Sequence, residues 1–125
     1  MSLILVIDDD PKILQLIEAI LDYEGHSPIT ARDGREGLAL LSHDVDLVIT
    51  DLLMPNKEGL ETIADIRRAG WGVPVVAITG GGSVGPRSYL ETARLIGANA
   101  LLAKPFTQDE MLATVRSILE VSVAC

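Results

Sequence analysis

The sequence is poor in cysteine, in aromatic residues and in positive charge, and it contains no long apolar run. Its one cysteine, Cys125, permits no internal disulfide bond, which suits a reducing compartment. Ten Lys and Arg residues stand against eighteen Asp and Glu residues, and the net charge of −8 argues against direct binding of nucleic acid. The N-terminus has neither a basic signal-peptide region nor an apolar stretch of about 18 residues. We therefore expect a cytoplasmic protein without a membrane span.

What the sequence does contain is enough apolar material for one domain. Of its 125 residues, 48% are hydrophobic, and we expect a single domain over residues 1–125. Short aliphatic runs alternate with segments of helical periodicity, which predicts an α/β fold of the (βα)5 type. Right-handed crossovers then give a doubly wound parallel sheet with helices on both faces. The predicted strands are Leu3–Ile7, His26–Thr30, Leu47–Thr50, Val73–Ile78 and Asn99–Ala103.

The helical segments are marked by apolar spacing and by their end signals. Pro11 suits a first helical turn, Gly25 suits a stop, and Thr107 with Glu110 three residues later forms a capping box. We interpret Asp33-Gly34 as a turn. The further predicted helices are Leu38–Leu41, Lys57–Ala69 with Leu60, Ile63, Ala64 and Ile66 facing inward, and Ser88–Ile96.

The segment from Asp46 to Pro55 is the most informative. Leu47, Val48 and Ile49 show no polar alternation, which is typical of a strand covered on both faces. The run ends on a carboxylate, Asp51. Ligands of open α/β sheets bind at the carboxyl ends of the strands, so Asp51 is a candidate reactive carboxylate.

Other polar residues also follow directly after predicted strands. Asp8 and Asp9 follow the first strand, Thr79 the fourth and Lys104 the fifth, so all can meet Asp51 at one sheet edge. Unit charges ~4 Å apart repel by about 4 kcal/mol at an effective dielectric constant of ~20. Protonation with a raised pKa or a bound Mg²⁺ would relieve this repulsion. Thr79 and Lys104 would then suit phosphoryl oxygens, and an aspartate can accept a phosphoryl group covalently.

The motifs together resemble the receiver domain of two-component response regulators. They are Val6–Pro11, Asp46–Pro55 with Gly59, Ile78–Gly80 and Lys104-Pro105-Phe106, in the family's order along the whole chain. The resemblance implies a flavodoxin-like strand order of 2-1-3-4-5.

The resemblance also assigns roles to the residues at the sheet edge. It implies that Asp51 is phosphorylated and that Mg²⁺ is held by Asp8, Asp9, Asp51 and the backbone carbonyl of Leu53. It further implies that Thr79 and Lys104 contact the phosphoryl group and that the Lys104-Pro105 bond is cis. His26 and His43 lack a carboxylate or cysteine partner in the sequence, and we expect them at the surface without a zinc site.

The implied function is a phosphorylation-controlled switch, not a conventional enzyme, because it catalyses only its own phosphorylation and dephosphorylation. The implied phosphoryl donor is a histidine kinase or a histidine phosphotransfer protein. The implied output surface consists of the fourth helix, the fifth strand and the fifth helix. The sequence identifies no downstream target, and it leaves a phosphorylation-dependent homodimer open.

The sequence departs from the family's usual pattern at two places, and it leaves two alternative functions open. Leu101 occupies the fifth-strand position where the family usually has an aromatic switch residue. The glycine-rich loop after Thr79 is longer than usual, and we predict that it is mobile until activation. The first alternative is a Mg²⁺-dependent phosphohydrolase of the haloacid-dehalogenase type, because Asp8-Asp9-Asp10 contains an Asp-x-Asp pattern. The second is an interaction module that ignores phosphate.

Overall fold

The computed structural model describes residues 2–52, 59–80 and 94–124 of the chain. The strands are β1 (Leu3–Ile7), β2 (Ser27–Ala31), β3 (Leu47–Asp51), β4 (Val75–Thr79) and β5 (Ala100–Ala103). The helices are α1 (Pro11–Tyr23), α2 (Gly34–Leu40), α3 (Gly59–Arg68) and α5 (Gln108–Ala124). No helix in these ranges is both long enough and apolar enough to cross a membrane.

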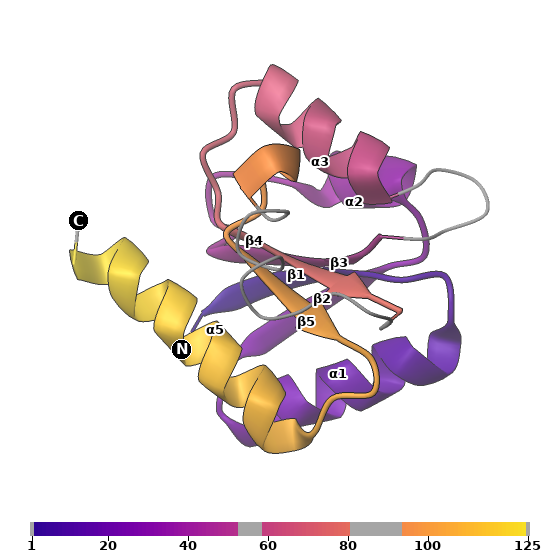
Figure 1. The fold of residues 1–125 in the computed structure, drawn as a ribbon, viewed down its shortest axis with the longest axis vertical. Coiled ribbons are helices and arrows are strands. Elements are labelled where there is room, and N and C mark those ends of the chain that lie inside the picture. The colour runs from indigo at the N-terminus through magenta and orange to yellow at the C-terminus, as the bar shows by residue number, and fades with distance from the viewer. Residues whose placement is uncertain (1, 53–58, 81–93, 125) are drawn as a thin grey trace.

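The five strands form one parallel sheet in the order β2-β1-β3-β4-β5. Helices α1 and α5 cover one face of this sheet, and α2 and α3 cover the other (Figure 1). The predicted fold class and strand order are confirmed. Of the predicted fourth helix, only residues 94–96 lie within the described ranges, and they are helical.

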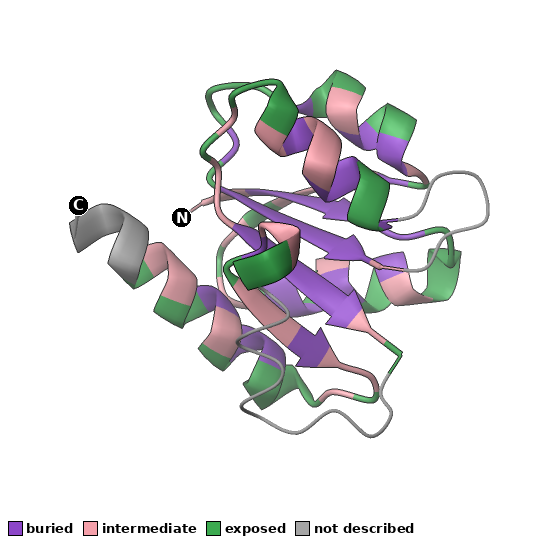
Figure 2. Cartoon of the chain, turned by 45° about the horizontal axis from the view of Figure 1, so that its top comes forward, coloured by how far each residue is buried: buried purple, intermediate pink, exposed green. Residues whose placement is uncertain are grey.

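The core consists of two apolar layers, one on each side of the sheet. Along β1, Ile4 and Val6 pack toward α1 and α5, whereas Leu5 and Ile7 pack toward the opposite layer with α3. Every residue of β3 is buried. Successive strand residues alternate between two covered faces, which explains why β1 is apolar without interruption and why β3 begins with three consecutive aliphatic residues. Figure 2 shows the buried strands between helices whose outer faces are exposed.

Several predicted boundaries are corrected by the structure. Asp33 does not make a simple turn: its side chain accepts a hydrogen bond from the Glu36 N–H (2.9 Å) and caps α2, which therefore begins at Gly34. The predicted strands β2 and β4 began too early, and Pro74 precedes β4. Leu60 is 42% exposed and does not face inward, because the buried side of α3 is formed by Gly59, Thr62, Ile63 and Ile66. The structure confirms the capping box: Thr107 Oγ1 and Glu110 Oε1 each accept a backbone N–H from the other residue.

The amino ends of β4 and β5 are joined by the side chain of Arg67. Its guanidinium donates hydrogen bonds to the carbonyl oxygens of Gly97 (3.0 Å), Trp71 (2.9 Å) and Val73 (2.8 Å), and to Asn99 Oδ1 (3.3 Å). Burial lowers the pKa of Arg67. These hydrogen bonds hold the partly buried guanidinium in place, and they connect α3 to the segment that precedes β5.

The histidine predictions are borne out for one residue only. His43 is exposed and packs against Trp71, with ring centroids 4.9 Å apart. His26 is half-buried instead of lying at the surface: its Nδ1 accepts the Ser2 N–H (3.3 Å), and its Nε2 is buried without a hydrogen bond. Burial lowers the pKa of His26. Trp71 is partly buried and packs against the core layer that contains α3.

Candidate functional site

Asp51 is the last residue of β3 and is only 6% exposed. It lies opposite Ile78 of β4 in the sheet register, and the preceding Thr50 lies opposite Ile7 of β1. The Thr50 hydroxyl donates a hydrogen bond to the Asp51 carbonyl oxygen (3.1 Å). The central strand therefore carries a buried carboxylate to the carboxyl edge of the sheet, between its two neighbouring strands.

Gly59, the first residue of α3, approaches the backbone of β3 closely. Its N–H donates a hydrogen bond to the Leu52 carbonyl (2.9 Å). A Cβ atom at this position would lie 1.9 Å from the Asp51 carbonyl oxygen. Only glycine therefore fits here, and the start of α3 abuts the backbone that presents Asp51.

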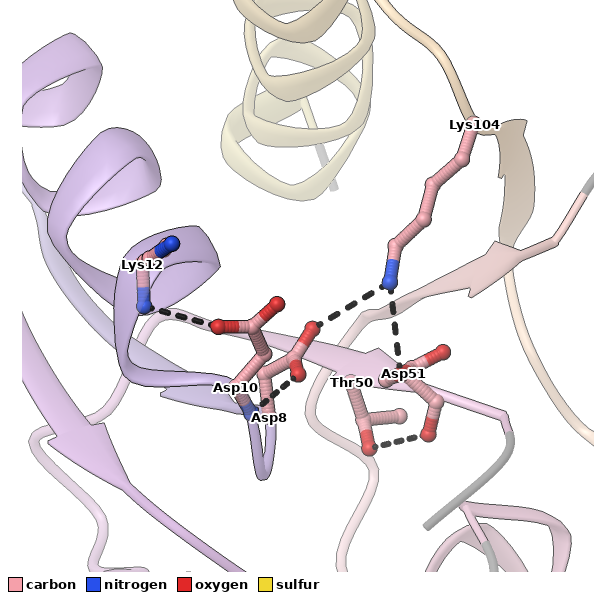
Figure 3. Close-up of polar contacts among 6 residues, drawn as sticks. All are labelled: Asp8, Asp10, Lys12, Thr50, Asp51 and Lys104. Carbon is pink, nitrogen blue, oxygen red and sulfur yellow. Dashed lines mark hydrogen bonds and ion pairs between the residues drawn. The ribbon is translucent and has the colours of Figure 1, made fainter.

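Asp8 follows β1 directly and is 1% exposed. Its backbone N–H donates a hydrogen bond to the Ala31 carbonyl of β2 (3.1 Å), which extends the ladder of the sheet by one bond. Its carboxylate Oδ1 accepts the Asp10 N–H (2.9 Å), as Figure 3 shows. Its Oδ2 is buried and makes no hydrogen bond. One oxygen of this carboxylate is thus fixed by the backbone, and the other remains available inside the site.

Lys104 reaches the two buried carboxylates from the end of β5 (Figure 3). Its Nζ lies 3.4 Å from Asp51 Oδ2 and 3.7 Å from Asp8 Oδ2, the latter an ion pair too long to be a hydrogen bond. The Lys104 N–H donates to the Thr79 carbonyl (2.8 Å), which fixes the start of this segment against β4. The Lys104-Pro105 bond is cis, as the resemblance implied.

The acidic residues form a cluster that one lysine does not neutralise. Ligand oxygens of Asp8, Asp9 and Asp51 all lie within 4.8 Å of one another, and Asp9 is exposed. Unit charges at this separation repel by about 3.5 kcal/mol at an effective dielectric constant of ~20. Burial raises the pKa of Asp8, and the charges of Asp51 and Asp9 raise it further, against the opposing effects of the Asp10 N–H and Lys104.

The donor set fits a hard divalent cation. It offers carboxylate oxygens only, and Mg²⁺ takes one or two carboxylates together with waters and phosphate oxygens. Three carboxylates and one ammonium leave a formal charge of −2, which a divalent ion would balance. Asp8 Oδ2, buried without a hydrogen bond, is the oxygen that most needs such a partner.

The structure brings together most of the residues that the sequence singled out. Asp8, Asp9, Asp51 and Lys104 converge, and Thr79 is the last residue of β4 at the same edge. The predicted Leu53 carbonyl and most of the glycine-rich loop lie outside the described residues. At the switch-residue position, Leu101 is half-buried against the layer that contains α3.

The sequence reasoning missed how Asp8 is oriented. Aspartate side chains often accept the backbone N–H two residues further on, so an aspartate directly after a strand, as at Asp8, was itself the signal for this bond.

An apolar groove of about 370 Å³ adjoins the site. It lies between α1 and the segment after β5, and Lys104 belongs both to the groove and to the acidic site. Leu16, on its α1 side, is 47% exposed. The residues that line it are Ile13, Leu16, Gly80, Lys104, Pro105 and Phe106.

Comparison with known proteins agrees with this arrangement. The transcriptional regulatory protein CpxR of Klebsiella pneumoniae is 39% identical over 120 residues, which are 95% of this chain and 50% of CpxR. The chain therefore spans about half the length of this relative. The receiver domain of the Francisella response regulator 1452 superposes with a TM-score of 0.86 at 28% identity, covering 98% of this chain and 99% of that one.

A second solved structure bears on the metal. The response regulator TrrA of Thermotoga maritima, in a complex with Mg²⁺-BeF, has a TM-score of 0.78 at 31% identity, covering 94% of this chain and 99% of TrrA. The model of the response regulator receiver domain family matches residues 4–116 of this sequence. With its strand order and its acidic edge, the chain belongs to the receiver domain family of two-component response regulators.

Proposed function

We propose that Asp51 accepts a phosphoryl group from a histidine kinase or a histidine phosphotransfer protein, and that Asp8, Asp9, Asp51 and the Leu53 carbonyl hold Mg²⁺ for this step. The observation that carries the proposal is the position of Asp51. It is a buried carboxylate at a strand end, with two further carboxylates within 4.8 Å and an ammonium group 3.4 Å away.

The transfer is a displacement at phosphorus. A lone pair of the Asp51 carboxylate forms the new P–O bond as the P–N bond of the donor breaks, and that electron pair returns to the donor imidazole. Bound Mg²⁺ supplies charge neutralisation. The Lys104 Nζ, which lies near both buried carboxylates, would stabilise the negative charge of the transferred phosphoryl group. The Thr79 hydroxyl is the proposed contact for another phosphoryl oxygen.

The apolar groove beside Lys104 is our proposed docking surface for a helix of the protein donor. It is continuous with the site, and its exposed Leu16 lies on the side of the sheet covered by α1. Leu16→Asp should therefore slow transfer from a purified histidine kinase but leave labelling by the small donor acetyl phosphate unchanged. Leu40→Asp, on exposed α2 surface across the sheet, is the matched control.

The proposal places the domain in the cytoplasm, with a phosphorylation-dependent change in the surface formed by the fourth helix, β5 and α5. The proposal specifies no downstream target, and it leaves a homodimer of the phosphorylated form open. Family membership does not favour the phosphohydrolase alternative.

The decisive experiment incubates the protein with acetyl phosphate and Mg²⁺ and measures its intact mass. We expect the wild type to gain one phosphoryl group and Asp51→Asn to gain none. Asp46→Asn is the matched control, because Asp46 lies just before the same strand, at its other end, and its carboxylate accepts the Leu3 N–H (2.9 Å). Equal labelling of Asp51→Asn and wild type would refute the assignment. Sustained hydrolysis of p-nitrophenyl phosphate would favour the phosphohydrolase.

A further inference from the structure

Asp10 lies next to the acidic cluster and caps helix α1. Its side chain accepts the Lys12 N–H (2.9 Å), and its carbonyl accepts the Leu14 N–H (3.1 Å). Its backbone is extended, with φ −91° and ψ 111°, and Pro11 at the first helical position has no N–H to satisfy. The start of α1 therefore fixes Asp10 through both its side chain and its carbonyl.

The N–H of the same residue holds Asp8. It donates to Asp8 Oδ1 (2.9 Å), so the Asp8 carboxylate has one oxygen bound to the backbone. The other oxygen, Oδ2, is turned toward Lys104 and the interior of the site (Figure 3). Two hydrogen bonds thus connect Lys12, Asp10 and Asp8. The bond from the Lys12 N–H to the Asp10 side chain holds Asp10 in place, and Asp10 supplies the N–H that Asp8 accepts.

We propose that Asp10 is a positioning residue for the metal site: by capping α1 it aims its own N–H at Asp8 and thereby orients Asp8 Oδ2 for Mg²⁺. This inference rests on the proposed function, because it presumes that Asp8 binds the metal. It assigns Asp10 no contact with the ion. Among the described residues, the carboxylates that gather within 4.8 Å are those of Asp8, Asp9 and Asp51, without Asp10.

Charge and capping are two separate ways in which Asp10 could affect Mg²⁺ binding. Asp10→Asn removes the charge and keeps an oxygen acceptor for the Lys12 N–H, whereas Asp10→Ala removes both. Both variants lose the same charge, so the ratio of their Mg²⁺ dissociation constants isolates the cap.

The chain offers a matched control for the cap itself. Asp33 caps α2 in the same manner, since its side chain accepts the Glu36 N–H (2.9 Å), and it is not part of the acidic cluster. Asp33→Ala removes one charge and one helix cap, as Asp10→Ala does. A purely structural role of capping would make the two variants equally less stable and leave Mg²⁺ affinity unchanged in both.

The experiment is calorimetric titration of the 125-residue chain with Mg²⁺ in about 0.15 M KCl, where exposed charges are screened beyond about 8 Å. It is carried out well below the melting temperature, with far-UV circular dichroism to verify that each variant is folded. We expect the dissociation constant of Asp10→Ala to exceed that of Asp10→Asn by about fivefold, the factor equivalent to a typical cap of about 1 kcal/mol. Asp33→Ala should bind like the wild type.

Three results would overturn the inference while the proposed function stands. These are equal Mg²⁺ affinities of Asp10→Ala and Asp10→Asn, an unchanged affinity in Asp10→Ala, or an equal loss in Asp33→Ala. Failure of the wild type to bind Mg²⁺ would overturn both proposals. Phosphorylation of the wild type but not of Asp51→Asn, measured separately, establishes the acceptor whatever the cap variants show.

Discussion

The close approach of Gly59 to β3 makes a sharp prediction about the effect of one methyl group. In Gly59→Ala the new Cβ would lie 1.9 Å from the Asp51 carbonyl oxygen and 2.7 Å from the Leu52 Cα atom. Both are backbone atoms, so no side chain can rotate away to make room. Because nonbonded atoms are usually about 3.5 Å apart, α3 or the end of β3 must move by more than about 1 Å. Overpacking of this kind costs about 1–3 kcal/mol, and we expect the upper end of that range.

The matched control is Gly72→Ala. A Cβ at Gly72 would meet nothing within 4 Å, and neither Gly59 nor Gly72 has a positive φ. Replacement of Gly72 should therefore change the free energy of unfolding by less than about 0.5 kcal/mol, as at most surface sites.

The assay is thermal unfolding of both variants, followed by labelling with acetyl phosphate. For a chain of this length, a loss of about 3 kcal/mol should lower the melting temperature by roughly 10–15 °C. Labelling of Gly59→Ala at a temperature where it is folded should also slow, because the backbone that presents Asp51 has shifted. Melting temperatures of the two variants within about 2 °C of each other would refute the reasoning.

Three further predictions concern Mg²⁺, pH and Arg67. Mg²⁺ at ten times its dissociation constant should stabilise the wild type by about 1.4 kcal/mol over EDTA in urea unfolding, and Asp8→Asn should lose that gain. In EDTA at pH 7.5, Asp8→Asn should be no less stable than the wild type, because the raised pKa of Asp8 means that its charged form disfavours the fold. The His26 pKa lies below the usual histidine value of about 6.5, so stability should be full above that pH and fall as pH drops through the folded pKa. His26→Gln should therefore lose less stability than the wild type between about pH 7.5 and 5, and identical profiles would contradict this. Arg67→Ala should cost about 2–3 kcal/mol in the free energy of unfolding, because its hydrogen bonds to three carbonyls are lost. Arg68→Ala, which among the described residues loses an exposed pair with Asp65, should cost less than about 0.5 kcal/mol, and equal losses would rule out the assigned role of Arg67.

The sheet and the acidic site were predictable from sequence for one physical reason. A strand covered on both faces needs an unbroken apolar run, so Leu47–Ile49 and the residue that ends the run could be recognised without coordinates. Parallel strands place all such ends at one edge, which brought Asp8, Asp51 and Lys104 together in the prediction.

What could not be predicted depends on contacts between segments distant in sequence or on short-range competition. Asp33-Gly34 has the composition of a turn, and that interpretation competed with a second signal, the Glu36 three residues after Asp33, whose N–H the Asp33 side chain accepts as the cap of α2. Leu60 fits the apolar spacing of α3, yet the buried side of the helix consists of Gly59, Thr62, Ile63 and Ile66, and Leu60 lies outside it. The half-burial of His26 follows from its packing near the N-terminus, to which no local pattern points.

The contact between Trp71 and His43 has a practical consequence for spectroscopy. Trp71 is the only tryptophan of the chain, and it precedes β4, whereas Asp51 ends the neighbouring strand at the opposite edge of the sheet. A five-residue strand spans about 16 Å, so the indole senses its imidazole neighbour and not a ligand bound at the acidic edge. Steady emission during a titration would therefore say nothing against binding, and a reporter for the acidic edge has to be introduced at that edge.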